Sequence, residues 1–246
     1  MERRRGVGLG LALTVTVGCA VAAVPIATAG QSRGTGVPAW GACPSEVAAT
    51  SPAIQCTTVP VPLDYRNPAG TTIDLTISRI ASVNPQKRRG VLLLNPGGPG
   101  LAGLDMPAQL VNRGIPASVL DAYDLIGMDT RGIGHSAPVD CRFTVEQGYP
   151  GNVPPWAKDA ATVAADAQAA RSVAEQCAAN DADGRMAHIS TANTARDLDR
   201  IRAALGEEKA SFSGFRMGRR WAPRTPRCFP RRPTASSSTA TSVTPR

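Results

Sequence analysis

Residues 90–103 read GVLLLNPGGPGLAG, an apolar run that ends in a loop of glycine and proline. A short apolar run with such a boundary predicts a strand covered on both faces, as in a parallel sheet. Outward from it, the apolar and polar residues of 71–80 alternate, which predicts a half-buried strand. Residues 122–129 and 209–214 predict two further strands.

Two helices are predicted between these strands. Residues 156–178 are rich in alanine, which indicates a covering helix more than a core helix. In 194–206, Thr194 and Asp197 predict a capping box at the start, and Gly206 predicts the stop. One face of this second helix carries Leu198, Ile201 and Leu205. The alternation of strands and helices predicts an α/β fold, with a mostly parallel sheet and flanking helices.

The amino terminus has the pattern of an export signal. Three arginines precede an uncharged stretch that reaches Ser32, and Ala27-Thr28-Ala29 forms a small-residue cleavage site. We therefore expect residues 1–29 to be a signal peptide, with a secreted protein that has no membrane span after its removal. The alternatives are an uncleaved membrane anchor and a lipid anchor at Cys19.

Five cysteines follow Ala29. In an oxidising compartment the first four could form two disulfides, most simply Cys43 with Cys56 and Cys141 with Cys177, which leaves Cys228 as an odd thiol. No metal site is predicted, because no cysteine pair has C-x-x-C spacing and the chain has only two histidines.

The net charge of +8 lies entirely in residues 216–246, which hold eight arginines and no acidic residue. This segment is rich in Arg, Pro and Ser without periodicity, so we expect it to be disordered. Because the rest of the chain is neutral, the charge does not indicate nucleic-acid binding by the fold. A non-catalytic exported protein whose basic tail binds acidic surfaces is one alternative function.

The loop after the strand at 90–95 admits three interpretations. Its residues 98–103 match the dinucleotide fingerprint G-x-G-x-x-G, and Asp121 and Asp124 follow at about the spacing of its acidic partner. However, Pro99 removes an N–H group from a loop that would have to donate such groups to phosphate. The second interpretation is an oxyanion loop, and the third is a turn without chemistry.

Four stretches together resemble one family: CTTVPVPLDYRNPAGTTIDLTISRIA (56–81), VLLLNPGGPGLAG (91–103), YDLIGMDTRGIGHSAPVDC (123–141) and TANTARDLDRIRAALGEEKASFSGF (191–215). They are similar to the secreted bacterial tripeptidyl aminopeptidases and their proline-iminopeptidase-like relatives in the α/β-hydrolase superfamily. The resemblance implies that 30–215 is the N-terminal portion of an α/β-hydrolase domain, with a peptide substrate and no cofactor. It also implies a serine nucleophile after the strand at 209–214, a later acid and histidine, and oxyanion donors at Gly98 and Met217.

The chain departs from this pattern at GFRMG (214–218), where Arg216 takes the place of the nucleophile. A guanidinium has only donors and cannot attack a carbonyl, so we predict an inactive polypeptide without nucleophile, acid or base. Two serines and two histidines do not replace them: Ser211, Ser213, His135 and His188. The serines are not at the apex of the turn, and the histidines precede it and are interpreted as surface or loop residues.

Two further residues near the strand at 122–129, Asp129 and Arg131, are expected to hold their own loop by local hydrogen bonds.

Beyond Phe215, the serine run 236–238 would encode apolar residues in a second reading frame. We therefore interpret 216–246 as the product of a frameshift in a C-terminally truncated relative. Such a chain is expected to fold poorly and to expose an unpaired strand edge.

Overall fold

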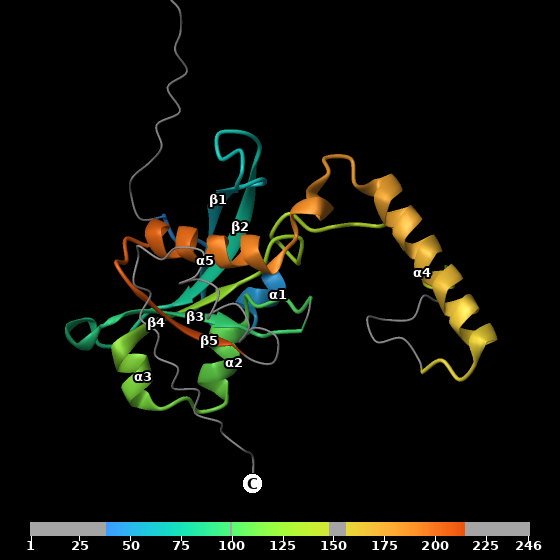
Figure 1. Ribbon diagram of the computed structural model, residues 1–246. Coiled ribbons are helices and arrows are strands. Elements are labelled where there is room, and N and C mark those ends of the chain that lie inside the picture. Colours follow the sequence, from blue (N-terminus) through green and yellow to red (C-terminus); the bar gives the residue numbers. More distant parts are fainter. Residues whose placement is uncertain (1–37, 99, 148–155, 215–246) are drawn as a thin grey trace, which may run out of the picture. The chain divides into compact units, whose positions relative to one another are not determined.

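The computed structural model describes residues 38–98, 100–147 and 156–214. Five strands form one sheet in the order β1-β2-β4-β3-β5 (Figure 1). The strands are β1 (Gln55–Pro62), β2 (Thr72–Ile80), β3 (Gly90–Asn95), β4 (Tyr123–Met128) and β5 (Ala210–Gly214). The helices are α1 (Ser45–Ala48), α2 (Met106–Asn112), α3 (Ala117–Ala122), α4 (Ala160–Asn180) and α5 (Thr191–Ala204). Three 3-10 turns are η1 (Pro85–Lys87), η2 (Val145–Gln147) and η3 (Arg185–His188).

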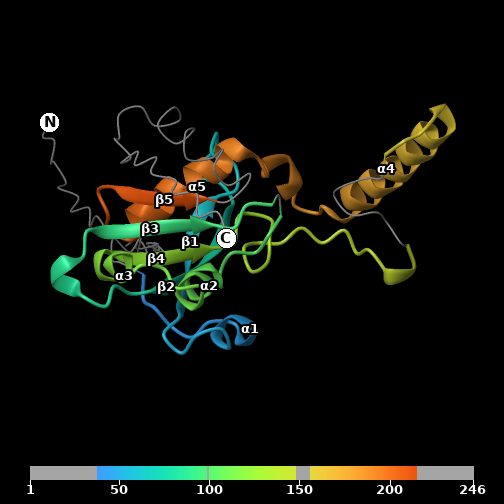
Figure 2. The ribbon, with the colours of Figure 1, turned by 90° about the horizontal axis from the view of Figure 1, so that it is seen from below.

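The sheet is parallel in its core. Strand β3 pairs in parallel with β4 on one side and with β5 on the other, and Figure 2 shows these three strands side by side. Strands β1 and β2 add two antiparallel pairings at the other side of β4. The predicted α/β fold class is therefore confirmed, and the four predicted strands lie within one residue of their expected ends.

Strand β1 was missed because it contains Pro60 and Pro62, which are rare inside a sheet. The structure places β1 at an edge, where its outer side needs no ladder partner. The predicted half-burial of β2 is wrong for its second half, since Thr76, Ser78 and their apolar neighbours are all buried. Both polar side chains have partners there: Thr76 Oγ1 donates to the His135 carbonyl, and Ser78 Oγ donates to the Leu104 carbonyl.

Helix α5 packs its apolar face on the sheet, as predicted. The three residues of that face are buried: Leu198, Ile201 and Leu205. The predicted start is wrong: the helix begins at Thr191, and Ser190 Oγ accepts the Asn193 N–H at 3.2 Å. Thr194 therefore lies inside the helix, where its own N–H bonds to the Ser190 carbonyl. The predicted stop is confirmed, because Gly206 has φ +74° and donates to the Ala203 carbonyl.

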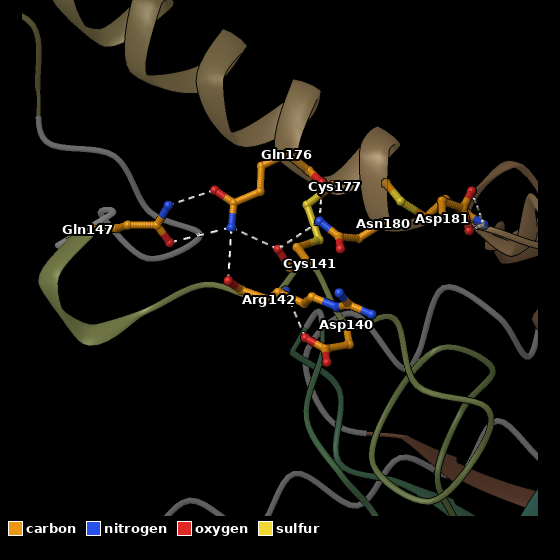
Figure 3. The surroundings of a disulfide bond; sticks show 9 residues. Asp140, Cys141, Arg142, Gln147, Gln176, Cys177, Asn180 and Asp181 are labelled. Carbon is orange, nitrogen blue, oxygen red and sulfur yellow. Dashed lines mark hydrogen bonds between the residues drawn. A yellow bond between two sulfur atoms is a disulfide. The ribbon is translucent and has the colours of Figure 1, made fainter.

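Helix α4 spans Ala160–Asn180, and Asp159 Oδ1 accepts the Thr162 N–H at its start. Among its residues Cys177 alone is buried, so the helix itself is confirmed and its expected covering role is not. Helix α4 is hydrogen-bonded to the preceding segment in its last turn, where Gln176 Nε2 donates to the carbonyls of Cys141 and Arg142 at 2.8 and 2.9 Å (Figure 3).

The structure contains the two disulfides expected from the sequence, Cys43–Cys56 and Cys141–Cys177. Within the described ranges, no helix is long and apolar enough to cross a membrane. The expected signal peptide at 1–29, the odd thiol Cys228 and the basic segment 216–246 lie outside the described residues.

Candidate active site

The glycine-rich loop and the end of β5 meet at one edge of the sheet. In the parallel pairing of β3 with β5, Asn95 is the register partner of Gly214. The loop begins directly after Asn95, and Gly214 is the last residue of β5. The loop therefore starts beside the point at which the sequence predicts the nucleophile elbow. Ligands of parallel α/β sheets bind at this carboxyl edge.

The loop needs its glycines for two reasons. Gly97, Gly98 and Gly100 have φ values of +86°, +118° and +84°, a region that other residues rarely adopt. A Cβ atom at Gly98 would also lie 2.7 Å from the Gly100 nitrogen. At Gly103 a Cβ atom would lie 2.4 Å from the Met128 carbonyl oxygen, so the loop packs directly against the end of β4.

The N–H groups of this loop differ in their partners. Asn95 Oδ1 accepts the Gly97 N–H at 2.9 Å. Gly98 N–H has no acceptor among the residues that the structure describes. An oxyanion loop requires a donor that is not already engaged within the protein. The second expected donor, Met217, and the nucleophile position, Arg216, lie outside the described residues.

The turn after β4 binds this loop. Asp129 is 1% exposed, and its Oδ1 accepts the Gly103 N–H at 2.7 Å. Its Oδ2 accepts the His135 N–H at 2.9 Å. The expected local role of Asp129 is thus present, but the bond to Gly103 links two segments that sequence proximity could not connect.

Arg131 does not act locally, which corrects the expectation for it. Its side chain is 1% exposed and donates from Nε and Nη2 to the two carboxylate oxygens of Asp197, each at 2.7 Å. Its Nη1 donates to the Leu63 carbonyl at 2.9 Å, and Tyr65 Oη donates to Asp197 Oδ1 at 2.8 Å. Burial, together with the neighbouring Asp197 carboxylate, raises the pKa of Tyr65 well above its ordinary value. This network holds α5 against the sheet.

The two histidines lie where the sequence suggested, in loop or turn structure. His135 is exposed, and its Nε2 lies 2.7 Å from Glu46 Oε1. His188 is in η3, and its Nδ1 lies 4.0 Å from Asp64 Oδ1. Within the described part of the chain, neither side chain hydrogen-bonds to the glycine-rich loop. Ser211 and Ser213 lie inside β5, paired with β3, and precede the position of the predicted elbow.

The dinucleotide interpretation is not supported by the geometry. Asp124 pairs with Val91 at the start of β3, whereas the loop follows the end of that strand. Its carboxylate is already engaged, because it accepts the Ser82 N–H at 2.8 Å and Arg88 Nε at 3.0 Å. Asp121 lies in α3 and pairs with Lys87 at 3.2 Å. Neither acid is positioned to bind a ribose held by the loop.

A cavity of about 290 Å³ lies elsewhere, between the segment before the Cys141–Cys177 disulfide and the chain after α4. It is lined mainly by charged residues, among them Asp140, Asp181, Asp183, Arg142 and Arg185. Several of these groups are engaged with one another: Asp183 pairs with Arg185 at 2.7 Å, and Asp140 Oδ1 accepts the Arg142 N–H. None of the residues that line this cavity belongs to the glycine-rich loop.

The α/β sheet and its loop are consistent with an α/β-hydrolase. No family model matches the chain. Curated relatives are a tripeptidyl aminopeptidase of Streptomyces lividans, 40% identical over 181 residues, and a carboxylesterase B of Mycobacterium tuberculosis, 37% identical over 183 residues. A serine protease Hip1 of Mycobacterium tuberculosis is 32% identical over 166 residues.

These alignments cover 73%, 72% and 67% of this chain, respectively. They cover 33%, 35% and 31% of the three relatives, so the chain spans about a third of their length. The resemblance to the tripeptidyl aminopeptidase group of the α/β-hydrolases is thereby confirmed. Two of these three relatives are named as peptidases, and one of the two as a serine protease.

Proposed function

We propose that residues 30–215 form the N-terminal portion of a secreted serine peptidase of the tripeptidyl aminopeptidase kind, and that this polypeptide is itself inactive. An intact enzyme of this kind hydrolyses peptide bonds near a substrate's N-terminus through an acyl-serine intermediate. The observation that supports the proposal is the register of Asn95 with Gly214, because the glycine-rich loop starts directly after Asn95 and the predicted elbow directly after Gly214. The names of the relatives support peptides as the substrate class.

The proposed chemistry requires three contributions at this edge of the sheet. A serine at the position of Arg216 would attack the peptide carbonyl, and a histidine paired with an acid would accept its proton. The N–H groups of Gly98 and Met217 would stabilise the negative oxygen of the tetrahedral intermediate. In this chain the first contribution is missing, because arginine carries only protonated donors at neutral pH.

Export is supported by two features. Residues 1–29 have the composition of a signal peptide, and the two disulfides are typical of proteins that fold in an oxidising compartment. Comparing the mass of the mature protein from a secreting host with that of a cytoplasmically expressed copy tests this part of the proposal. We expect the exported form to begin at Gly30.

The activity is tested with tripeptidyl chromogenic substrates. We expect no turnover by this chain and no labelling by a fluorophosphonate, which reacts with activated serines. We also expect the gene to read as an elbow with serine in the second frame near codon 216. Restoration of that frame should then produce hydrolysis that the fluorophosphonate blocks. Turnover by the present polypeptide would contradict the assignment of Arg216, and codons that exclude the second reading would remove the frameshift.

A further inference from the structure

The glycine-rich loop is held at both ends by buried side-chain acceptors. At its start, Asn95 Oδ1 accepts the Gly97 N–H at 2.9 Å, and at its end Asp129 Oδ1 accepts the Gly103 N–H at 2.7 Å. The side chains of Asn95 and Asp129 come from two neighbouring strand ends, and each residue is 1% exposed. The loop is thus fixed at two points that are shielded from competing water.

The carboxylate of Asp129 also fixes the turn on which it stands. Its Oδ2 accepts the His135 N–H, and a Cβ atom at Gly134 would lie 2.2 Å from that oxygen. The same turn is anchored to β2, because Ser136 Oγ accepts the Thr76 N–H at 2.9 Å. One carboxylate therefore joins the loop after β3 to a turn that is itself fixed to the sheet.

Between the two anchored N–H groups lies the N–H of Gly98, which has no acceptor among the described residues. A donor that stabilises a developing oxyanion must already point at it before reaction, because reorientation during the reaction costs free energy. Hydrogen bonds to a buried carboxylate are stronger than neutral ones and therefore suit this task. The Asn95 side chain also carries a buried Nδ2 that has no hydrogen-bond partner within the described residues.

We propose that Asp129 is a positioning residue of the candidate active site: with Asn95, it fixes the glycine-rich loop so that the Gly98 N–H faces the reacting carbonyl oxygen. Asp129 does not touch substrate and acts through Gly103. The role assigned to the Gly98 N–H in this inference rests on the proposed function. We call the two hydrogen bonds, from Gly97 to Asn95 and from Gly103 to Asp129, the clamp; it is tested without catalysis.

The test uses the ¹⁵N-labelled full chain and its Asp129→Asn variant, observed by NMR. Two N–H groups donate to the two carboxylate oxygens, and an amide can accept only one of them while presenting an NH₂ group to the other. We expect the amide that loses its acceptor, Gly103 or His135, to exchange with solvent roughly tenfold faster or more, and the Gly98 resonance to shift. Titration with trialanine, whose carboxylate imitates a product, should move the Gly98 resonance in the parent chain and less in the variant.

Asp124→Asn is the matched control. Asp124 is also a buried carboxylate associated with β4, it also accepts a backbone N–H, and it lies at the opposite end of that strand. A general loss of stability would affect both variants, whereas positioning predicts a change at Gly98 for Asp129→Asn alone. Equal Gly98 resonances in the parent and Asp129→Asn would overturn the inference, and so would an equal change in Asp124→Asn.

If Asp129→Asn does not fold, Asn95→Ala tests the other end of the clamp. It should release the Gly97 amide and shift Gly98 while Gly103 stays protected; an unchanged Gly98 would overturn the inference. A separate observation tests the proposed function. If saturating trialanine leaves every resonance of the loop unmoved in the parent protein, the proposed function is wrong. In that case a Gly98 change confined to Asp129→Asn still supports the clamp.

Discussion

Arg131 and Asp197 are 66 positions apart in the sequence and form a bidentate ion pair in which both side chains are 1% exposed. The guanidinium also lies 5.3 Å from the centre of the Tyr65 ring. The pair joins the turn after β4, which binds the glycine-rich loop, to helix α5, which packs on the sheet.

Replacement of Arg131 by alanine should lower the free energy of unfolding by about 3–5 kcal/mol, because it leaves the Asp197 carboxylate buried without its counter-ion. Urea denaturation measures this loss. Arg66→Ala is the matched control, since Arg66 also pairs with an aspartate but its side chain is 86% exposed. That variant should keep the parent's midpoint. Equal losses in the two variants would show that the burial of the pair does not matter.

The Tyr65 hydroxyl should make the protein sensitive to alkali. Its pKa in the folded protein lies above its ordinary value of 10.0, so above that pH the unfolded chain loses a proton that the folded chain retains. Stability from this group is therefore present below pH 10 and lost as pH rises above it. Unfolding measured from pH 8 to 11 should fall more steeply for the parent than for Tyr65→Phe. Parallel profiles would contradict this role.

Removal of the disulfide at α4, by Cys141→Ser with Cys177→Ser, should act locally. Cys177 is the buried residue of α4, and the polar ties of its last turn reach Cys141 and Arg142. Limited proteolysis should then cut within 160–175 much sooner, while the protection of β3 and β4 against hydrogen exchange stays unchanged. The pair Cys43→Ser with Cys56→Ser is the comparison, because Cys56 lies in β1 and in the core. That change should weaken the sheet itself.

Gly103→Ala should destabilise the protein by about 1–3 kcal/mol, since the new methyl group would meet the Met128 carbonyl and neither backbone can move freely. Gly41→Ala serves as the control, because the nearest atom to its Cβ is 4.0 Å away. Thermal unfolding compares the two variants. A Gly103→Ala protein as stable as Gly41→Ala would show that the loop is not packed against β4 as described.

How much the sequence predicts depends on the range of the interactions. The apolar run of β3 and the stop at Gly206 were correct because each is decided by neighbouring residues. The capping box was wrong for a tertiary reason: Asp197 is bound to Arg131 and Tyr65 rather than to its own helix end. Composition alone could not reveal that partner, since it is distant in sequence.

The same difference between local and long-range interactions applies to the candidate site. The glycine spacing predicted a loop after β3, because it reports local backbone freedom. The choice of Gly98 as a donor came from the family resemblance and stays a prediction. The bond from Asp129 to Gly103 could not be predicted, because it depends on β3 and β4 being neighbours in the sheet. A signal was present in the order of two strands each followed by a polar residue at its carboxyl end, Asn95 and Asp129.

The two margins of the sheet differ in what they offer to another chain. On β1, Cys56 exchanges both backbone hydrogen bonds with Gly41 across the outer margin. With the two-residue period of a strand, the next outward N–H positions are Thr58, Pro60 and Pro62, and the prolines have no hydrogen to give. Among the described strands β5 has a neighbour on one side only, and none of its residues is a proline. The outer margin of β1 therefore lacks two of the N–H donors that an added strand would need, whereas no proline interrupts the ladder that β5 can offer.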